Sequence, residues 1–118
     1  MTSEDEESDI RILDFDLSKI LGSYEKCEEP YGALNCYAPE IIVDEPYSKA
    51  VDLWSLGIMI YLMVNDKLPF NSEDENEIAR QVAYDEPDFS RDPVWKNISD
   101  ECKNFIKRLL AFYLLIFL

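Results

Sequence analysis

An apolar stretch near the middle of the chain places the strongest constraint on the fold. Residues 53–64 read LWSLGIMIYLMV and put apolar side chains on nearly every face of a helix. Such a helix is stable only inside a protein core or in lipid, and twelve residues fall short of the roughly 20 that a membrane span needs. We therefore predict a helix from about Lys49 to Asn65, capped by the Ser48 hydroxyl and buried in the middle of the domain.

The composition excludes several classes of function. The 118 residues carry 25 acidic and 11 basic side chains, a formal charge of −14. Binding through many Lys and Arg contacts to phosphates is therefore disfavoured, and we expect no nucleic-acid partner. The chain contains no histidine, so a Ser-His-Asp triad cannot be built from it. Its three cysteines form no C-x-x-C pair, which indicates reduced thiols and a cytoplasmic, intracellular location.

The residues before the apolar stretch predict a strand and a long loop. Residues 9–17 read DIRILDFDL and alternate as a short half-buried strand does, before a turn at Asp14 to Asp16. Residues 18–37 contain Gly22, Pro30 and Gly32 without a helical period. We expect a long irregular segment there, and such loops in a compact domain are usually functional or disordered.

Two helices are predicted after the apolar stretch, which makes the fold mainly α. A capping box from Ser72 to Glu75 begins a helix over residues 71–85, with Ile78 and Val82 on one face. A last helix begins at Ser99. Its apolar stripe has helical spacing and consists of Cys102, Phe105, Ile106, Leu109, Leu110 and Tyr113.

Four segments, taken in order, resemble the carboxyl-terminal lobe of eukaryotic protein kinases. Asp14 and Phe15 match the first two letters of the D-F-G motif, Ala38-Pro39-Glu40 matches A-P-E, and residues 47–57 resemble the D-x-W-S-x-G helix start. Residues 94–110, VWKNISDECKNFIKRLL, resemble calcium/calmodulin-dependent and calcium-dependent kinases. The resemblance covers residues 9–110. It implies that residues 1–118 form a partial kinase domain, a short strand and activation loop followed by helices, with an atypical apolar tail at 111–118.

The resemblance also implies roles for single residues. Asp14 would hold Mg²⁺ on the phosphates of ATP, with Phe15 packed beneath it, although a solvated turn acid is the simpler interpretation of an isolated Asp. The residues that match structural motifs of the family are Ala38, Pro39, Glu40, Asp52, Trp54 and Gly57. Asp52 would accept backbone N–H groups of the catalytic loop, or would simply be an acid in a first helical turn. The arginine that pairs with the glutamate of A-P-E in the family would lie beyond this chain.

The segment between the two motifs has the place of an activation loop. Ser23, Tyr24 and Tyr31 are candidate phosphorylation sites in it, and unmodified loop residues are the alternative at each position. Two residues depart from the family pattern. Asp16 stands where the family has Gly, and Ala33 stands where it usually has Thr. A modified metal site and a lost one are both compatible with Asp16.

The printed sequence has no G-x-G-x-x-G loop, V-A-I-K strand or H-R-D-x-x-x-x-N catalytic loop. We therefore expect no catalytic residue here and no phosphate transfer by this polypeptide alone. We expect a fragment, from a gene model or a degraded gene, of an ATP-dependent Ser/Thr kinase with protein substrates. A calmodulin or calcium-sensing segment would belong only to a longer chain. The alternatives are a non-catalytic, pseudokinase-like module for a basic protein partner, and an unrelated small acidic helical protein.

Overall fold

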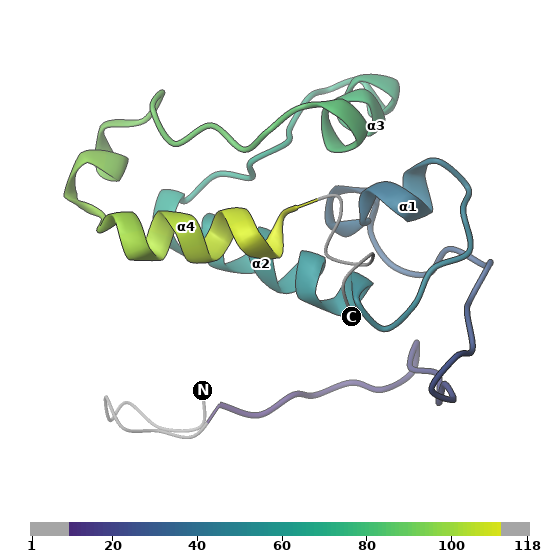
Figure 1. The fold of residues 1–118 in the computed structure, drawn as a ribbon. Helices are drawn as coiled ribbons and strands as arrows, with labels where there is room; N and C mark the ends of the chain where they lie inside the picture. The colour runs from purple at the N-terminus through teal and green to yellow at the C-terminus, as the bar shows by residue number, and fades with distance from the viewer. Residues whose placement is uncertain (1–9, 112–118) are drawn as a thin grey trace.

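The computed structural model describes residues 10–111, and in this range the fold is mainly α-helical (Figure 1). No helix in the described range is long and apolar enough to cross a membrane. The elements in chain order are the 3-10 helix η1 (Leu34–Cys36), α1 (Pro39–Ile42), α2 (Val51–Asn65), α3 (Glu75–Tyr84), the 3-10 helix η2 (Pro93–Asn97) and α4 (Asp100–Leu109).

The central helix α2 ends where the sequence predicts but begins two residues late. Ser48 Oγ accepts the N–H of Ala50 at 3.3 Å and so closes a turn ahead of the helix. Ala50 is then the N-cap residue, and no side chain caps α2, so the predicted Ser48 cap is wrong. At the other end Asp66 takes the left-handed conformation, with φ of 55°, and donates its N–H to the Leu62 carbonyl at 2.8 Å. That geometry stops the helix.

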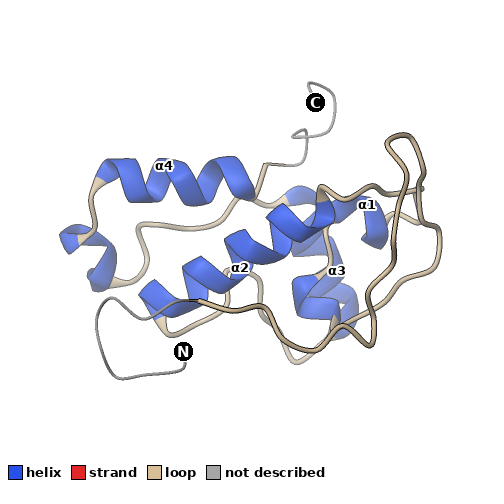
Figure 2. Ribbon diagram, turned by 90° about the horizontal axis from the view of Figure 1, so that it is seen from below, coloured by secondary structure: helices blue, strands red, loops and turns tan. Residues whose placement is uncertain are grey.

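One face of α2 forms the core. Trp54, Ile58 and Tyr61 are at most 5% exposed on that face. The buried side chains clustered with them come from the other elements and the loops between them, and are Ala38, Phe70, Ile78, Val82, Trp95, Ile106 and Leu110. Helix α4 has the most extensive contact with α2 and lies alongside it (Figures 1 and 2). The buried core is therefore assembled on one side of α2.

The opposite side of α2 is exposed, so the prediction of burial on every face is wrong. We call this surface the open face of α2; its members are 37–77% exposed and are Leu53, Leu56, Met59, Leu62 and Met63. Residues 10–20 pass below this side of the helix in Figure 1 and cross in front of it in Figure 2. They do not cover it, since Ile10, Ile12 and Leu13 are themselves 78–89% exposed.

The predicted strand at residues 9–17 does not form over its described part, residues 10–17. Backbone N–H and C=O groups of a strand need a neighbouring strand, and no described segment lies beside this one in a ladder. The described β pairing is one isolated bridge in which Cys27 and Tyr47 exchange N–H···O bonds of 2.8 and 2.9 Å. The alternating residues Ile10 and Ile12 therefore have no neighbouring strand to pair with among the described residues.

The helix predicted over residues 71–85 forms as α3, with a different cap. Asp74 Oδ1 accepts the N–H of Asn76 at 3.0 Å and caps the helix, which starts at Glu75. Ser72 Oγ instead accepts the N–H of Asp74 at 3.1 Å and shapes the preceding turn. The predicted N-cap at Ser72 is therefore wrong, because the N-cap lies two residues later, at Asp74. The predicted inward face is confirmed, because Ile78 and Val82 are both buried.

The last helix forms as predicted. Ser99 Oγ accepts the N–H of Cys102 at 3.2 Å, which confirms the cap. Three residues of the apolar stripe, Ile106, Leu109 and Leu110, are buried, with at most 8% exposure. Cys102 is half-buried. Phe105, at the margin of the stripe, is 52% exposed. Tyr113 and residues 112–118 of the predicted tail lie outside the described residues.

The contact between α2 and α4 depends on the absence of a side chain at Gly57. A Cβ at this position would lie 2.9 Å from Leu109 Cβ and 2.8 Å from Leu110 Cδ2. Alanine gains about 1 kcal/mol of helix propensity over glycine, whereas overpacking costs about 1–3 kcal/mol. We expect Gly57→Ala to lower the free energy of unfolding by about 1 kcal/mol, measured by urea denaturation.

Gly22→Ala is the control for this variant. Its added Cβ would have only ordinary contacts, the nearest at 3.7 Å. We expect a change within about 0.5 kcal/mol, as for most surface substitutions. A Gly57→Ala chain as stable as the natural one would show that α4 is not packed closely on α2.

Candidate functional site

The Asp14 turn is built from local hydrogen bonds. Asp14 has φ of 65°, a left-handed conformation that Asp adopts more readily than most residues, and its Oδ1 accepts the Asp16 N–H at 3.3 Å. The Phe15 carbonyl accepts the N–H and the hydroxyl of Ser18, at 3.0 and 2.6 Å. The turn is therefore complete without a metal or any distant residue of the chain.

Phe15 and the two acids do not assemble a nucleotide site. Phe15 is 65% exposed. Within residues 10–111 no three His, Cys, Asp or Glu side chains are grouped as metal ligands, and the Asp14 turn offers only the carboxylates of Asp14 and Asp16. The described residues do not fit a Mg²⁺–ATP complex on their own.

The hydroxyl groups of the long loop are accessible. Tyr24 is 98% exposed, Ser23 is also exposed, and Tyr31 is 52% exposed. The Tyr31 hydroxyl donates to a carboxylate oxygen of Glu29, and this hydrogen bond raises the Tyr31 pKa above its ordinary value. Tyr47 donates its hydroxyl to the Glu29 carbonyl, which ties the loop to the start of the α2 region. Modification at Ser23, Tyr24 or Tyr31 stays a prediction.

Ala38, Pro39 and Glu40 form a buried corner after the loop. Ala38 is 1% exposed, and Pro39 is fully buried at the first position of α1, where its missing N–H costs nothing. Glu40 is half-buried and has no ion pair among the described residues. Burial, which penalises its charged form, holds the Glu40 pKa above the ordinary value, and the nearby Glu45 adds to the shift.

Helix α2 holds the other predicted residues and contacts the end of the loop. Asp52 is exposed in the first turn of α2, while Trp54 is 5% exposed and stacks on Phe70, with ring centroids 6.0 Å apart. Ser55, which the sequence analysis did not single out, donates its hydroxyl to the Cys36 carbonyl at 3.0 Å. The structure thus joins the buried corner to α2, whereas no described hydrogen bond joins either to the Asp14 turn.

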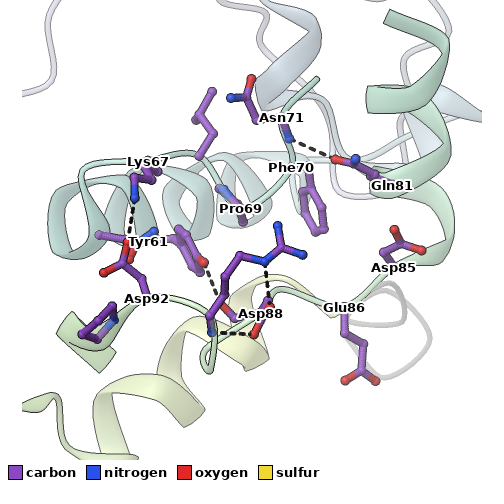
Figure 3. Close-up of a pocket in the computed structure, with 14 residues that line it drawn as sticks. Tyr61, Lys67, Pro69, Phe70, Asn71, Gln81, Asp85, Glu86, Asp88 and Asp92 are labelled. Atoms are coloured by element: carbon purple, nitrogen blue, oxygen red, sulfur yellow. Dashed lines mark hydrogen bonds and ion pairs between the residues drawn. The ribbon is translucent and has the colours of Figure 1, made fainter. Parts of the chain in front are cut away.

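A cavity of about 540 Å³ lies between the end of α2, α3 and the loop that follows α3 (Figure 3). Tyr61 donates its hydroxyl to the Asp88 carbonyl at 2.7 Å, and Lys67 pairs with Asp92 at 2.7 Å across it. Sequence reasoning missed this site. The signals were Asp88, whose spacing from Ser90 is typical of an Asx turn, and Asn65, a polar residue that ends an apolar run.

Comparison with known proteins identifies the family of the chain. The family model for the protein kinase domain matches residues 1–113. The chain belongs to the protein kinase family. Similar curated proteins include a probable myosin light chain kinase of Dictyostelium discoideum, 35% identical over 108 residues, 92% of this chain and 31% of the relative. Calcium/calmodulin-dependent protein kinase type 1 of Macrobrachium nipponense is 37% identical over 112 residues, 92% of this chain and 31% of the relative.

A calcium-dependent kinase has a similar match. Calcium-dependent protein kinase 25 of Arabidopsis thaliana is 34% identical over 108 residues, 92% of this chain and 20% of the relative. The chain therefore spans less than a third of the length of these kinases. The predicted resemblance to this group of kinases is confirmed, and so is the mainly α, partial-lobe fold. Protein kinases use ATP and Mg²⁺ to phosphorylate protein substrates.

The raised pKa of Glu40, the glutamate of A-P-E, predicts that the stability of the fold depends on pH. A raised pKa means that the folded state binds the Glu40 proton more tightly than the unfolded state does. Stability is therefore lost as the pH rises from the ordinary glutamate pKa of about 4.3 through the raised folded-state value. We expect Glu40→Gln to raise the urea midpoint at about pH 7 and to leave it unchanged at about pH 3.

The control for this variant is Glu73→Gln, which changes an exposed acid and should behave like the natural chain at both pH values. If Glu40→Gln lowered the midpoint at neutral pH, a cation would be paired with this carboxylate, and the burial argument would be wrong.

Proposed function

We propose that this chain forms the activation-segment and central-helix part of a Ser/Thr protein kinase domain. The domain would resemble calcium/calmodulin-dependent kinases and would phosphorylate protein substrates with ATP and Mg²⁺ when its remaining parts are present. The observation that carries the proposal is the joint between A-P-E and α2. Ala38 and Pro39 are buried, and the Ser55 hydroxyl holds the Cys36 carbonyl at the end of the loop.

This joint suits the way in which kinases achieve catalysis. Phosphoryl transfer is accelerated almost entirely by positioning and by electrostatic stabilisation, so the ends of the activation segment need a rigid base. Here α2 supplies that base through its packing with α4, and the loop is anchored at Cys36 and through the Cys27–Tyr47 bridge. The Asp14 turn carries no such anchor among the described residues.

The open face of α2 is the surface on which the rest of such a domain would pack. It presents Leu53, Met59 and Met63 at 37%, 53% and 77% exposure. Contiguous exposed apolar side chains of this size favour an interaction surface over a solvated one. The kinases that match this chain are more than three times as long as the matched segment. We therefore assign the remaining part of the kinase domain as the occupant of this face.

The 118-residue polypeptide alone should not transfer phosphate. The support is the exposed Asp14 turn, which gathers no further ligands in the described range, together with the absence from the printed sequence of a phosphate-pairing Lys and an H-R-D catalytic loop. We expect no incorporation of labelled phosphate into a calcium/calmodulin-dependent kinase substrate peptide by the purified chain with Mg²⁺–ATP. The control is Asp14→Asn. A rate in the natural chain that this variant abolishes would contradict the proposal.

A non-catalytic, pseudokinase-like interaction module is the second candidate function. It is favoured by Asp16 and Ala33, which replace the flexible Gly and the hydroxyl-bearing Thr of the family, and by the exposure of Phe15. The two functions separate in a chain completed with the missing kinase parts. If the module is correct, the completed domain is inactive and regains activity only with Asp16→Gly and Ala33→Thr. If the enzyme is correct, the completed domain is active without them.

The cysteines and the relatives support a proposal about the cellular setting. Cys27, Cys36 and Cys102 are all free thiols, which supports an intracellular location. Two of the similar kinases are named for dependence on calcium or calmodulin. Regulation by a calcium sensor is accordingly proposed for a longer chain that contains this segment, and not for residues 10–111 themselves.

A further inference from the structure

Tyr47 fastens the long loop to the chain segment that precedes α2. Cys27 and Tyr47 are 7% and 8% exposed and exchange backbone N–H···O bonds of 2.8 and 2.9 Å. The Tyr47 hydroxyl also donates to the carbonyl of Glu29, two residues further along the loop. We call these three hydrogen bonds the Tyr47 latch. The latch fixes residues 27–29 of a loop whose neighbouring side chains are exposed.

Tyr31 links an accessible hydroxyl group to this latch. It is 52% exposed, and its hydroxyl donates to a carboxylate oxygen of Glu29, the residue whose carbonyl Tyr47 holds. This hydrogen bond is the main reason why the Tyr31 pKa is raised, and the neighbouring Tyr47 and Cys27 add to the shift. An enzyme can therefore reach the Tyr31 oxygen, and a charge placed there acts on the latch.

The other exposed tyrosines of residues 10–111 have no such connection. Tyr24 and Tyr84 are 98% and 79% exposed, and the hydrogen bonds of tyrosine hydroxyls in this range all involve other tyrosines. Tyr47 itself is buried and out of reach of a modifying enzyme. A modification at Tyr31 therefore changes a contact of the fold, whereas one at Tyr24 or Tyr84 changes only the surface.

We propose that Tyr31 is a phosphorylation site whose phosphate opens the Tyr47 latch. A protein tyrosine kinase transfers the γ-phosphoryl group of ATP to the Tyr31 oxygen. The new O–P bond forms as the bond between this phosphorus and ADP breaks, and the phenol loses its proton. The product has no hydroxyl donor for Glu29, and it places a charge of about −1.5 to −2 beside the Glu29 carboxylate.

Repulsion between the phosphate and Glu29 is what opens the latch. Glu29 has no ion pair among the described residues, and the adjacent Glu28 is a further exposed acid. A phosphate next to carboxylates disrupts local structure by like-charge repulsion. As Glu29 moves away, its carbonyl leaves the Tyr47 hydroxyl and the bridge at Cys27 loosens. This release goes beyond the proposed function and needs no phosphate transfer by the chain itself.

The direct test compares amide hydrogen exchange in three semisynthetic forms of the 118-residue chain: unmodified, phosphorylated at Tyr31, and phosphorylated at Tyr24. The amides of Cys27 and Tyr47 donate the two bridge bonds and so report on the latch. We expect phosphate on Tyr31 to accelerate their exchange about two- to fivefold, the range of an exposed charge pair. Phosphate on Tyr24 should leave it unchanged. Equal exchange in the two phosphorylated forms would overturn the proposal.

The Asp66 amide is the internal control of this experiment. It is bonded to the Leu62 carbonyl at 2.8 Å at the end of α2, away from the loop. It should exchange at the same rate in all three forms. Faster exchange at Asp66 together with Cys27 and Tyr47 would mean general unfolding in place of a local release, and would also overturn the proposal.

Two variants identify the charge that acts on the latch. Glu29→Gln keeps the backbone carbonyl but removes the carboxylate, so phosphate on Tyr31 should no longer accelerate exchange at Cys27. Glu28→Gln is the matched control, because it removes the adjacent exposed acid with the same change in net charge. The acceleration should persist in this control. If Glu29→Gln kept the acceleration, or Glu28→Gln abolished it, repulsion at Glu29 would not be the cause.

Phosphopeptide mapping tests the modification itself. The chain would be isolated from its own cells with orthovanadate present, so that tyrosine phosphatases cannot remove the phosphate. We expect phosphotyrosine at Tyr31. Phosphotyrosine found only at Tyr24 or Tyr84, or at no tyrosine, would overturn the assignment of the site.

Discussion

The burial of one face of α2 is the interaction on which the rest of the structure depends. Trp54 stacks on Phe70, Gly57 lets α4 approach, and Tyr61 joins Phe89 and Trp95 in a cluster with ring centroids 4.7–5.6 Å apart. Each aromatic pair contributes about 0.5–1.5 kcal/mol beyond the area that it buries. The A-P-E corner and the cavity are both placed by this face, so a change in α2 would move both.

The acidic and basic residues are distributed unevenly along the chain. Residues 1–45 contain 13 acidic and 3 basic side chains, and residues 46–118 contain 12 and 8. In the second part most described ion pairs lie at the ends of α3 and in the loop after it, where Arg80 joins Glu77 and Asp85. The pairs are exposed and contribute little to stability.

The sequence predicts elements that are stabilised by local interactions and fails where a distant partner decides. Helix α4, the end of α2 and the inward face of α3 follow from helical spacing and from the Ser99 cap. The strand at residues 9–17 and the full burial of α2 do not form in the described range, because each needs a neighbour that these residues do not supply. The kinase motifs gave the family correctly. The kinase motifs did not predict the cavity, because Asn65 and Asp88 line it together only after α2 packs against the loop that follows α3.

Complementation tests the central claim most directly. The part of the Macrobrachium nipponense calcium/calmodulin-dependent protein kinase type 1 that lies outside the segment matching this chain would be added to this chain. The methyl signals of Met59 and Met63 would then be followed by NMR. If the open face of α2 is an internal surface of a kinase domain, the two fragments bind, both methyl signals shift, and Met63→Glu prevents binding. Methyl signals that stay in place, or binding that Met63→Glu leaves unchanged, would contradict the account.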